Sequence, residues 1–396
     1  MRNVFKPQEE YLLELLKATL QRSISEKELN REEADIQQVI SVARQHAVLS
    51  LLYDTVQELP VFAEGRDRVE RETRQIVLQN YRLLFLSKYL IGLLEQHGIQ
   101  ALLLKGVSTA QYYPVPELRK SGDVDLLVAG DVDKNQLFSI LKEAGFQEKE
   151  EQHANHHMEY ISPDGVLVEI HTTLTEDFAQ KEINRALEEL NEGCFRNIQK
   201  DVIMGVELPN LSKPYHACEL LLHMLHHFLR TGFGLKLLCD WVVLWQQEWS
   251  EEEKGCFQEL TRKSNIHRFA EIITATCVEY LGMDKKEFPW DYVTEEIPVE
   301  EFMKEILEAE EFGGSDKNRM VMLEGTGLWA YVKEFHHQMH MNFPRAGKCF
   351  LLWPALWLIT LVRFLRNNRT IRRTSAGEIL REAHRRSDLI KKLKLF

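Results

Sequence analysis

A run that alternates acidic and apolar residues, Asp123-Val124-Asp125-Leu126-Leu127-Val128, constrains the fold of this chain more than any other segment. Its apolar part, residues 124–128, has the length and composition of a buried strand. Side chains two residues apart on a strand point to the same face, so we expect Asp123 and Asp125 to converge on one point in space. Two converging carboxylates suit a divalent cation.

Other short apolar runs predict a small mixed sheet around this strand. Residues 101–104 are typical of a buried strand that ends at the tight turn Lys105-Gly106. Two more strands are expected at residues 158–161 and 166–170, joined by Pro163-Asp164-Gly165. In that turn proline fixes φ and glycine accepts a positive φ.

The rest of the chain has the three-to-four-residue periodicity of amphipathic helices, including a long helix expected at residues 66–97. At 396 residues the chain is long enough for two or three modules. The sequence therefore predicts an α+β fold. A small mixed-sheet core at residues 99–175 is expected between an N-terminal helical segment, 1–98, and a C-terminal helical domain, 176–396.

The overall charge argues against one class of partner. The chain has 49 lysines and arginines against 61 aspartates and glutamates, a formal net charge of -12. Binding a long nucleic acid needs a broad basic surface, so we expect no such partner. The first residues lack the apolar core of a signal peptide and the six cysteines form no Cys-x-x-Cys pair, so a reduced, cytoplasmic setting is expected.

A third carboxylate, Glu169, lies within the strand predicted at residues 166–170. An unpaired carboxylate between apolar neighbours is costly to bury, and a cation shared with Asp123 and Asp125 would supply the missing partner. Mg²⁺ and Mn²⁺ prefer oxygen ligands of this kind, usually together with substrate phosphates. Three carboxylates that hold two metal ions form the usual apparatus of nucleotidyl transfer.

The turn before this strand is expected to serve the phosphate side of such a site. Gly106 lets the backbone approach phosphate oxygens closely, and Ser108 adds a hydroxyl at the start of a short predicted helix. Lys105 and Arg119 are expected to neutralise phosphate charge. The guanidinium of an arginine suits this role because it binds phosphate through two parallel hydrogen bonds. The alternative for Arg119 is an exposed loop residue without a binding role.

The order of these motifs carries a family resemblance. The motifs are Leu104-Lys105-Gly106, Tyr112-Tyr113-Pro114, Arg119, the Gly-Asp-Val-Asp-Leu-Leu-Val block at residues 122–128, and Val168-Glu169-Ile170-His171. Together they resemble the uncharacterised bacterial nucleotidyltransferase family, within the superfamily related to DNA polymerase beta. The resemblance runs from about Leu83 to Trp245. Val107 separates Gly106 from Ser108, which are commonly adjacent in that superfamily, so the phosphate-side turn departs from the pattern.

This resemblance implies a reaction, a cofactor and a set of ligands. A nucleoside monophosphate would pass from an NTP such as ATP to an acceptor, with Mg²⁺ or Mn²⁺ held by Asp123, Asp125 and Glu169. A small molecule, a peptide or a protein is the expected acceptor. The alternative is a catalytically inactive module that binds NTP or metal without chemistry.

Histidines near the predicted site have two interpretations each. His171 shares a strand face with Glu169, so we expect it to orient that carboxylate, to contact substrate, or to be a hydrogen-bonded core residue. The helix expected at residues 213–230 carries a polar stripe, made of His216, Glu219, His223, His227 and Arg230. The stripe either faces the catalytic cleft, with His223 and His227 as candidate substrate contacts, or forms a solvated helix face.

One apolar segment, residues 349–365, stands outside this scheme. Its only charge is Arg363, it includes Pro354, and it falls short of the about 20 residues that span a bilayer. It therefore predicts a buried or interfacial helix. The arginines that follow it keep open a weak membrane-surface contact through residues 349–373, as in a membrane-peripheral interaction protein.

Overall fold

The computed structural model describes residues 5–23, 25, 29, 31, 34–129, 132–149, 157–174, 181–230, 232–309, 336, 339–340, 343, 349–367, 385–386 and 388–394. The helices are α1 (Pro7–Leu20), α3 (Ile36–Gln45), α4 (Tyr53–Glu58), α5 (Arg66–Gln96), α6 (Lys105–Ala110), α7 (Lys134–Glu143), α8 (Lys181–Arg196), α9 (Lys213–Arg230), α10 (Leu235–Trp245), α11 (Glu251–Lys263), α12 (His267–Leu281), α13 (Val299–Ala309) and α15 (Trp353–Asn367). The strands are β1 (Ala101–Leu103), β2 (Val124–Val128), β3 (Gln147–Glu148), β4 (His157–Ile161), β5 (Leu167–His171), β6 (Ile198–Ile203) and β7 (Val206–Leu211).

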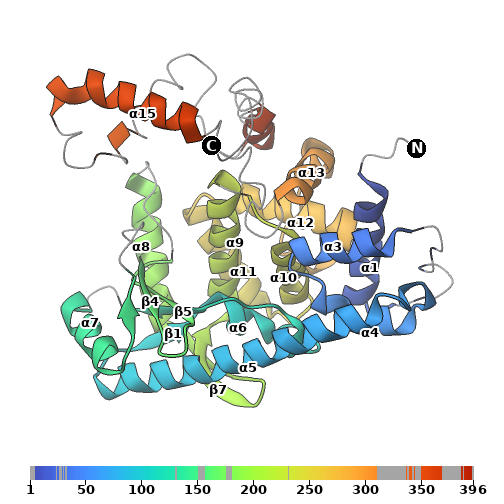
Figure 1. The fold of residues 1–396 in the computed structure, drawn as a ribbon, viewed down its shortest axis with the longest axis horizontal. Coiled ribbons are helices and arrows are strands. Elements are labelled where there is room, and N and C mark those ends of the chain that lie inside the picture. The colour runs from blue at the N-terminus through green and yellow to red at the C-terminus, as the bar shows by residue number, and fades with distance from the viewer. Residues whose placement is uncertain are drawn as a thin grey trace.

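The strands form one mixed sheet in the order β3-β4-β5-β2-β1-β7-β6. Strand β2 is antiparallel to β1 and parallel to β5, and β1 is parallel to β7. The sheet lies between the long helix α5 on one side and helices such as α8 and α9 on the other (Figure 1). A mixed sheet set among helices confirms the predicted fold class.

The sheet extends beyond the predicted core through two further strands, β6 and β7. Their residues, 198–211, belong to the part of the chain that was predicted to be helical. They form a hairpin in which Ile203 pairs with Val206. The two residues between them, Met204 and Gly205, both have positive φ, 46° and 81°. That conformation is typical of the two-residue turns that join antiparallel strands. The predicted helical reading of residues 198–211 is therefore wrong.

The two faces of the sheet pack against different helices. On one face Leu103, Val124, Leu126 and Ile170 are buried against apolar residues of α5 and α7. On the other face, Leu102, Leu104 and Leu127 pack with residues of α8 and with Leu211. Because side chains alternate along a strand, Asp125 and Glu169 belong to the second face. The carboxylates therefore face away from α5.

The first and last parts of the chain share one hydrophobic core. Residues of α1 and α3, such as Leu12 and Ile40, are buried in the same cluster as Trp241 of α10 and Phe269 of α12. The aromatic ring of Trp241 is fully buried beside that of Trp245, with ring centroids 5.7 Å apart. The division into domains at residues 98 and 175 stays a prediction, but the packing joins the two outer segments.

Candidate active site

The parallel pairing of β2 with β5 brings the predicted carboxylates together. Asp125 is registered with Glu169, and Leu127 with His171. Asp123 immediately precedes β2, at a bend, and its carboxyl group interacts electrostatically with Asp125 and Glu169. The register thus pairs Asp125 with Glu169, and Asp123 lies near them at the start of the strand.

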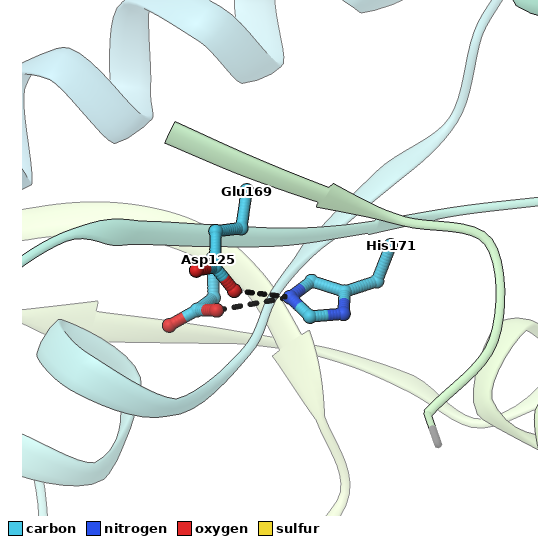
Figure 2. Close-up of side chains that lie close together, drawn as sticks. All are labelled: Asp125, Glu169 and His171. Carbon is cyan, nitrogen blue, oxygen red and sulfur yellow. Dashed lines mark hydrogen bonds and ion pairs between the residues drawn. The ribbon is translucent and has the colours of Figure 1, made fainter. Parts of the chain in front are cut away.

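His171 contacts two of these carboxylates through one ring nitrogen. Its Nε2 lies 3.0 Å from Oδ1 of Asp125 and 3.3 Å from Oε2 of Glu169. Figure 2 shows both carboxylates directed at that nitrogen. One ligand atom from each of the three side chains lies within 4.8 Å of the others, an arrangement that could hold a metal ion. Sequence reasoning kept His171 for orientation or substrate contact and did not predict it among the ligands.

Lys105 enters the same cluster from the turn that follows β1. Its Nζ lies 3.0 Å from Oδ1 of Asp125. The next residue, Gly106, has φ 48° and ψ -116°, a conformation that side chains with a Cβ rarely adopt. Lys105 itself has a φ of 26°. The predicted tight turn is present, and it places the ammonium group against the carboxylates.

The two aspartates have opposite electrostatic environments. Burial, Asp125 and Glu169 raise the pKa of Asp123 to about 7, against the weaker opposing effect of Lys105 and Lys236. For Asp125, burial also favours the neutral form, but Lys105 and the hydrogen bond from His171 together hold its pKa below its usual range. Protein cations therefore compensate the charge of Asp125, whereas Lys105 and Lys236 only partly offset the cost of ionising Asp123.

The two bases respond to the same carboxylates. Burial lowers the pKa of His171, as does Lys105, but the hydrogen bonds to Asp125 and Glu169 outweigh both and raise it. Burial likewise lowers the pKa of Lys105, and the charges of Asp125, Glu219 and Glu169 raise it well above its usual range. Lys105 is consequently charged at every physiological pH.

Helix α9 contributes a further carboxylate, Glu219, to this face of the sheet. Its side chain is buried, and within the described part of the chain Oε2 has no hydrogen-bond partner. Burial raises the pKa of Glu219 to about 7, with Lys105 opposing and Asp125 adding to the shift. The polar stripe of the sequence contained this residue, but no reasoning from the sequence singled it out. An acidic residue among apolar neighbours on a helix was the available signal.

The other members of the stripe have different surroundings. His216 accepts or donates hydrogen bonds at both ring nitrogens, to Thr109 at 3.2 Å and to Tyr112 at 2.9 Å, and burial lowers its pKa to about 3. It therefore joins α9 to α6 as a neutral core residue. The rings of His223 and His227 are in contact, with centroids 4.4 Å apart. Their substrate contacts stay predictions, and the side chain of Arg230 lies outside the described residues.

Two residues predicted to bind phosphate have structural partners instead. The guanidinium of Arg119 is buried and forms two hydrogen bonds to Asp240, at 2.8 and 2.7 Å. Its Nη1 donates to the carbonyl of Gly106 at 2.9 Å. The hydroxyl of Ser108 is also buried and donates to Oδ1 of Asn210 at 2.6 Å. This geometry favours roles in supporting the Gly106 turn, and phosphate contact by either residue stays a prediction.

The donor set fits a hard divalent cation. Burial and the neighbouring carboxylates Asp125 and Glu169 raise the pKa of Asp123 to about 7, and Oε2 of the buried Glu219 has no hydrogen-bond partner among the described residues. Carboxylate oxygens are the ligands that Mg²⁺ and Mn²⁺ prefer. Asp125, Glu169 and His171 could hold such an ion, and the predicted ligand role of Asp123 stays a prediction. The positive charge of an ion would favour the ionised form of Asp123.

A family comparison agrees with this geometry. The model of a family described as uncharacterised nucleotidyltransferase matches residues 32–282, more than half of the chain. The chain belongs to this nucleotidyltransferase family. The match includes every strand and the helices from α3 to α12, and it confirms both the predicted family and the predicted enzyme class.

Solved structures similar to this nucleotidyltransferase were also found. An antigenic nucleotidyltransferase-like protein from Paracoccidioides brasiliensis is 17% identical, with a TM-score of 0.31, over 51% of this chain and 93% of its own. The lincosamide antibiotic adenylyltransferase LnuA, bound to lincomycin, is 16% identical, with a TM-score of 0.25, over 46% of this chain and 95% of its own. A comparison with curated proteins gave no match.

Proposed function

We propose that this nucleotidyltransferase moves a nucleoside monophosphate from an NTP to a small-molecule, peptide or protein acceptor, with Asp123, Asp125 and Glu169 holding Mg²⁺ or Mn²⁺. The observation that carries the proposal is the register of β2 with β5, which sets Asp125 against Glu169 on one face of the sheet. Asp123 has the same parity. A divalent ion bound there supplies positive charge that neutralises phosphate oxygens and lowers the pKa of an attacking group.

The residues of the chain have separate tasks in this proposal. Lys105, charged and 3.0 Å from Asp125, offers a cation on the phosphate side of the carboxylates. His171 fixes the orientation of Asp125 and Glu169 through its Nε2. Arg119 holds the Gly106 carbonyl and so keeps the turn that presents Lys105.

The transfer itself is a substitution at phosphorus. A nucleophilic oxygen or nitrogen of the acceptor forms a bond to the α-phosphorus of the NTP, the bond between the α-phosphorus and the bridging oxygen breaks, and pyrophosphate leaves. The proton of the acceptor passes to a base. Buried Glu219 of α9, with a pKa of about 7, is a carboxylate of suitable strength that interacts electrostatically with Lys105 and Asp125.

Incubation of the full chain with each α-labelled NTP, Mg²⁺ or Mn²⁺, and an extract of metabolites and proteins tests the proposal. We expect pyrophosphate release and a labelled product with one NTP, and loss of both with Glu169→Gln. A matched control is Glu207→Gln, at an exposed position on β7, which should retain the parental rate.

The same experiment separates the enzyme from a binding module. A module that binds NTP without chemistry would gain thermal stability from NTP and Mg²⁺ but release no pyrophosphate in any extract. That outcome would replace the proposed transfer by metal-dependent nucleotide binding at the same carboxylates. Equal rates for the parent and Glu169→Gln would instead remove Glu169 from the mechanism.

A further inference from the structure

Exposed apolar side chains gather in and before α15. Within the described residues, large hydrophobic side chains are exposed at Phe350, Leu351, Leu352, Leu358, Ile359, Leu361 and Val362. Leu351 is 74% exposed and Leu358 is 63% exposed, values typical of charged surface residues. We call these seven residues the α15 surface. In Figure 1 the helix lies at the upper edge of the molecule, away from the sheet.

The opposite side of α15 is the side that packs against the protein. Leu356 and Thr360 are buried, and Nε1 of Trp357 donates to Nδ1 of His336 at 3.2 Å. The ring of Trp353 also contacts His336, with centroids 4.5 Å apart. Positions 353, 356, 357 and 360 form one stripe of α15, so Leu358 and Val362 lie on the reverse side. Leu351 lies in the 3₁₀ turn before the helix. One side of α15 thus packs against the described part of the protein, and the reverse side is exposed to solvent.

The charged residues of this segment indicate which kind of partner the α15 surface fits. The chain as a whole is acidic, with a net charge of -12, yet it has no aspartate or glutamate between Glu334 and Glu378. Arg363 and Arg366 belong to α15 itself. A segment with an apolar helix face, with arginines and without acidic residues complements a partner that has an apolar interior and an anionic surface. A lipid bilayer that contains anionic headgroups has that chemistry.

The dimensions of α15 specify how it would meet a bilayer. Its 15 residues are about 22 Å long, shorter than the about 30 Å of a hydrocarbon core. No described helix combines the length and the hydropathy needed to cross a membrane. A helix of this kind lies in the interface with its apolar side inserted between headgroups.

We propose that the α15 surface docks this protein onto anionic membrane surfaces, with Leu358 and Val362 inserting and the net positive charge of residues 349–367 attracting the headgroups. The docking is independent of nucleotidyl transfer, because no residue of the α15 surface belongs to the carboxylate site. The proposal covers residues 349–367. The remainder of the predicted contact segment, 368–373, lies outside the described residues.

Flotation of the full chain with vesicles tests this docking. We compare vesicles of phosphatidylcholine alone with vesicles that also contain phosphatidylglycerol, at low and high salt. The parent should bind the anionic vesicles, and high salt should weaken binding because it screens the arginines. The variant Leu358→Glu with Val362→Glu should reduce the partition coefficient about tenfold or more, since it places two charges on the inserting side.

Matched variants make the outcome specific. Leu78→Glu alters an apolar side chain of α5 that is 71% exposed, so it changes exposed hydrophobicity without touching α15 and should bind like the parent. Arg363→Gln with Arg366→Gln should weaken binding to anionic vesicles and leave binding to neutral ones unchanged. Circular dichroism of each variant establishes that the fold is retained.

Two results would overturn the proposal. One is a parent chain that does not float with anionic vesicles. The other is a parent chain that does not bind vesicles and that has the mass of a dimer by light scattering, while the variant Leu358→Glu with Val362→Glu has the mass of a monomer. A second copy of the chain would then cover the α15 surface. Neither result bears on pyrophosphate release, so the proposed function and the docking fail or succeed separately.

Discussion

Asp123 and Asp125 differ by two positions on one strand face, and replacing each by asparagine should change stability in opposite directions when metal is absent. Asp125 is held ionised by Lys105 and His171. For Asp123, Lys105 and Lys236 only partly oppose burial, Asp125 and Glu169, which raise its pKa from 3.8 to about 7. Asp123→Asn removes an unfavourable charge, whereas Asp125→Asn removes half of a buried ion pair.

The pKa of Asp123 sets the size and the pH range of the first effect. A pKa change of one corresponds to about 1.4 kcal/mol, so ionising Asp123 in the folded chain costs at most ~4 kcal/mol at pH 8. Because Asp123 and Asp125 share their electrostatic field, we expect Asp123→Asn to recover about 1–3 kcal/mol of unfolding free energy. A carboxyl with a raised folded pKa destabilises increasingly as pH rises from about 4 to 7, so the gain should shrink towards pH 5.

Asp125→Asn should have the opposite sign and the opposite pH dependence. Lys105 and His171 lose the negative charge of the oxygen that both contact, and breaking a buried ion pair costs about 3 kcal/mol or more. A carboxyl with a lowered folded pKa stabilises above its unfolded pKa, near 4, and that contribution is lost as pH falls through the folded value. The loss caused by Asp125→Asn is therefore fully present at pH 5 and at pH 8.

Urea unfolding in EDTA at pH 5 and pH 8, followed by tryptophan fluorescence, measures both effects. Asp291→Asn, at an exposed position, is the control and should match the parent. The variants are compared only where the dependence of free energy on urea is unchanged. A less stable Asp123→Asn at pH 8 would refute the electrostatic reasoning. The double variant is a poor test of function, because its two opposing effects on stability are confounded.

Three further predictions concern the support of the site and its metal. Arg119→Met and Asp240→Asn should each lower the free energy of unfolding by about 3–5 kcal/mol in urea titrations, because each variant leaves a buried charge without its partner. A loss below about 1 kcal/mol would contradict a buried ion pair. Gly106→Ala should lose about 1–3 kcal/mol through strain at φ 48°, whereas Gly255→Ala, in the open interior of α11, should be neutral or stabilising in the same titration. Increasing concentrations of Mg²⁺ or Mn²⁺ should raise the melting temperature of the parent to a plateau at pH 8, and should raise that of Glu169→Gln less. Equal increases in melting temperature for the two proteins would place the ion elsewhere.

Local patterns in the sequence were sufficient to locate most of the site. The strand predicted at residues 124–128 coincides with β2, and the helix predicted at residues 213–230 coincides with α9. Side-chain alternation, with a period of two, placed Asp123 and Asp125 on one face before any pairing was known. The pairing of β2 with β5 then put Glu169 beside Asp125, as the need for a shared cation had suggested.

Long-range partners were beyond the reach of those patterns. Arg119 and Asp240 are separated by 121 positions, and nothing local shows that the guanidinium turns inwards to that carboxylate and not outwards to phosphate. Ser108 likewise pairs with Asn210, on a strand that was not predicted. Helical periodicity before and after residues 198–211 concealed a hairpin whose six-residue strands give only a short alternating signal.

The balance of charge at the site argues that metal and nucleotide bind together. Four carboxylates, Asp123, Asp125, Glu169 and Glu219, interact with the cations Lys105, Lys236 and His171. A triphosphate alone would add negative charge beside four carboxylates, and repulsion would oppose its binding. A divalent ion alone would compete with the ammonium of Lys105 for Asp125. Together their charges partly cancel, and Lys105 can then serve phosphate oxygens, so each ligand should raise the affinity for the other.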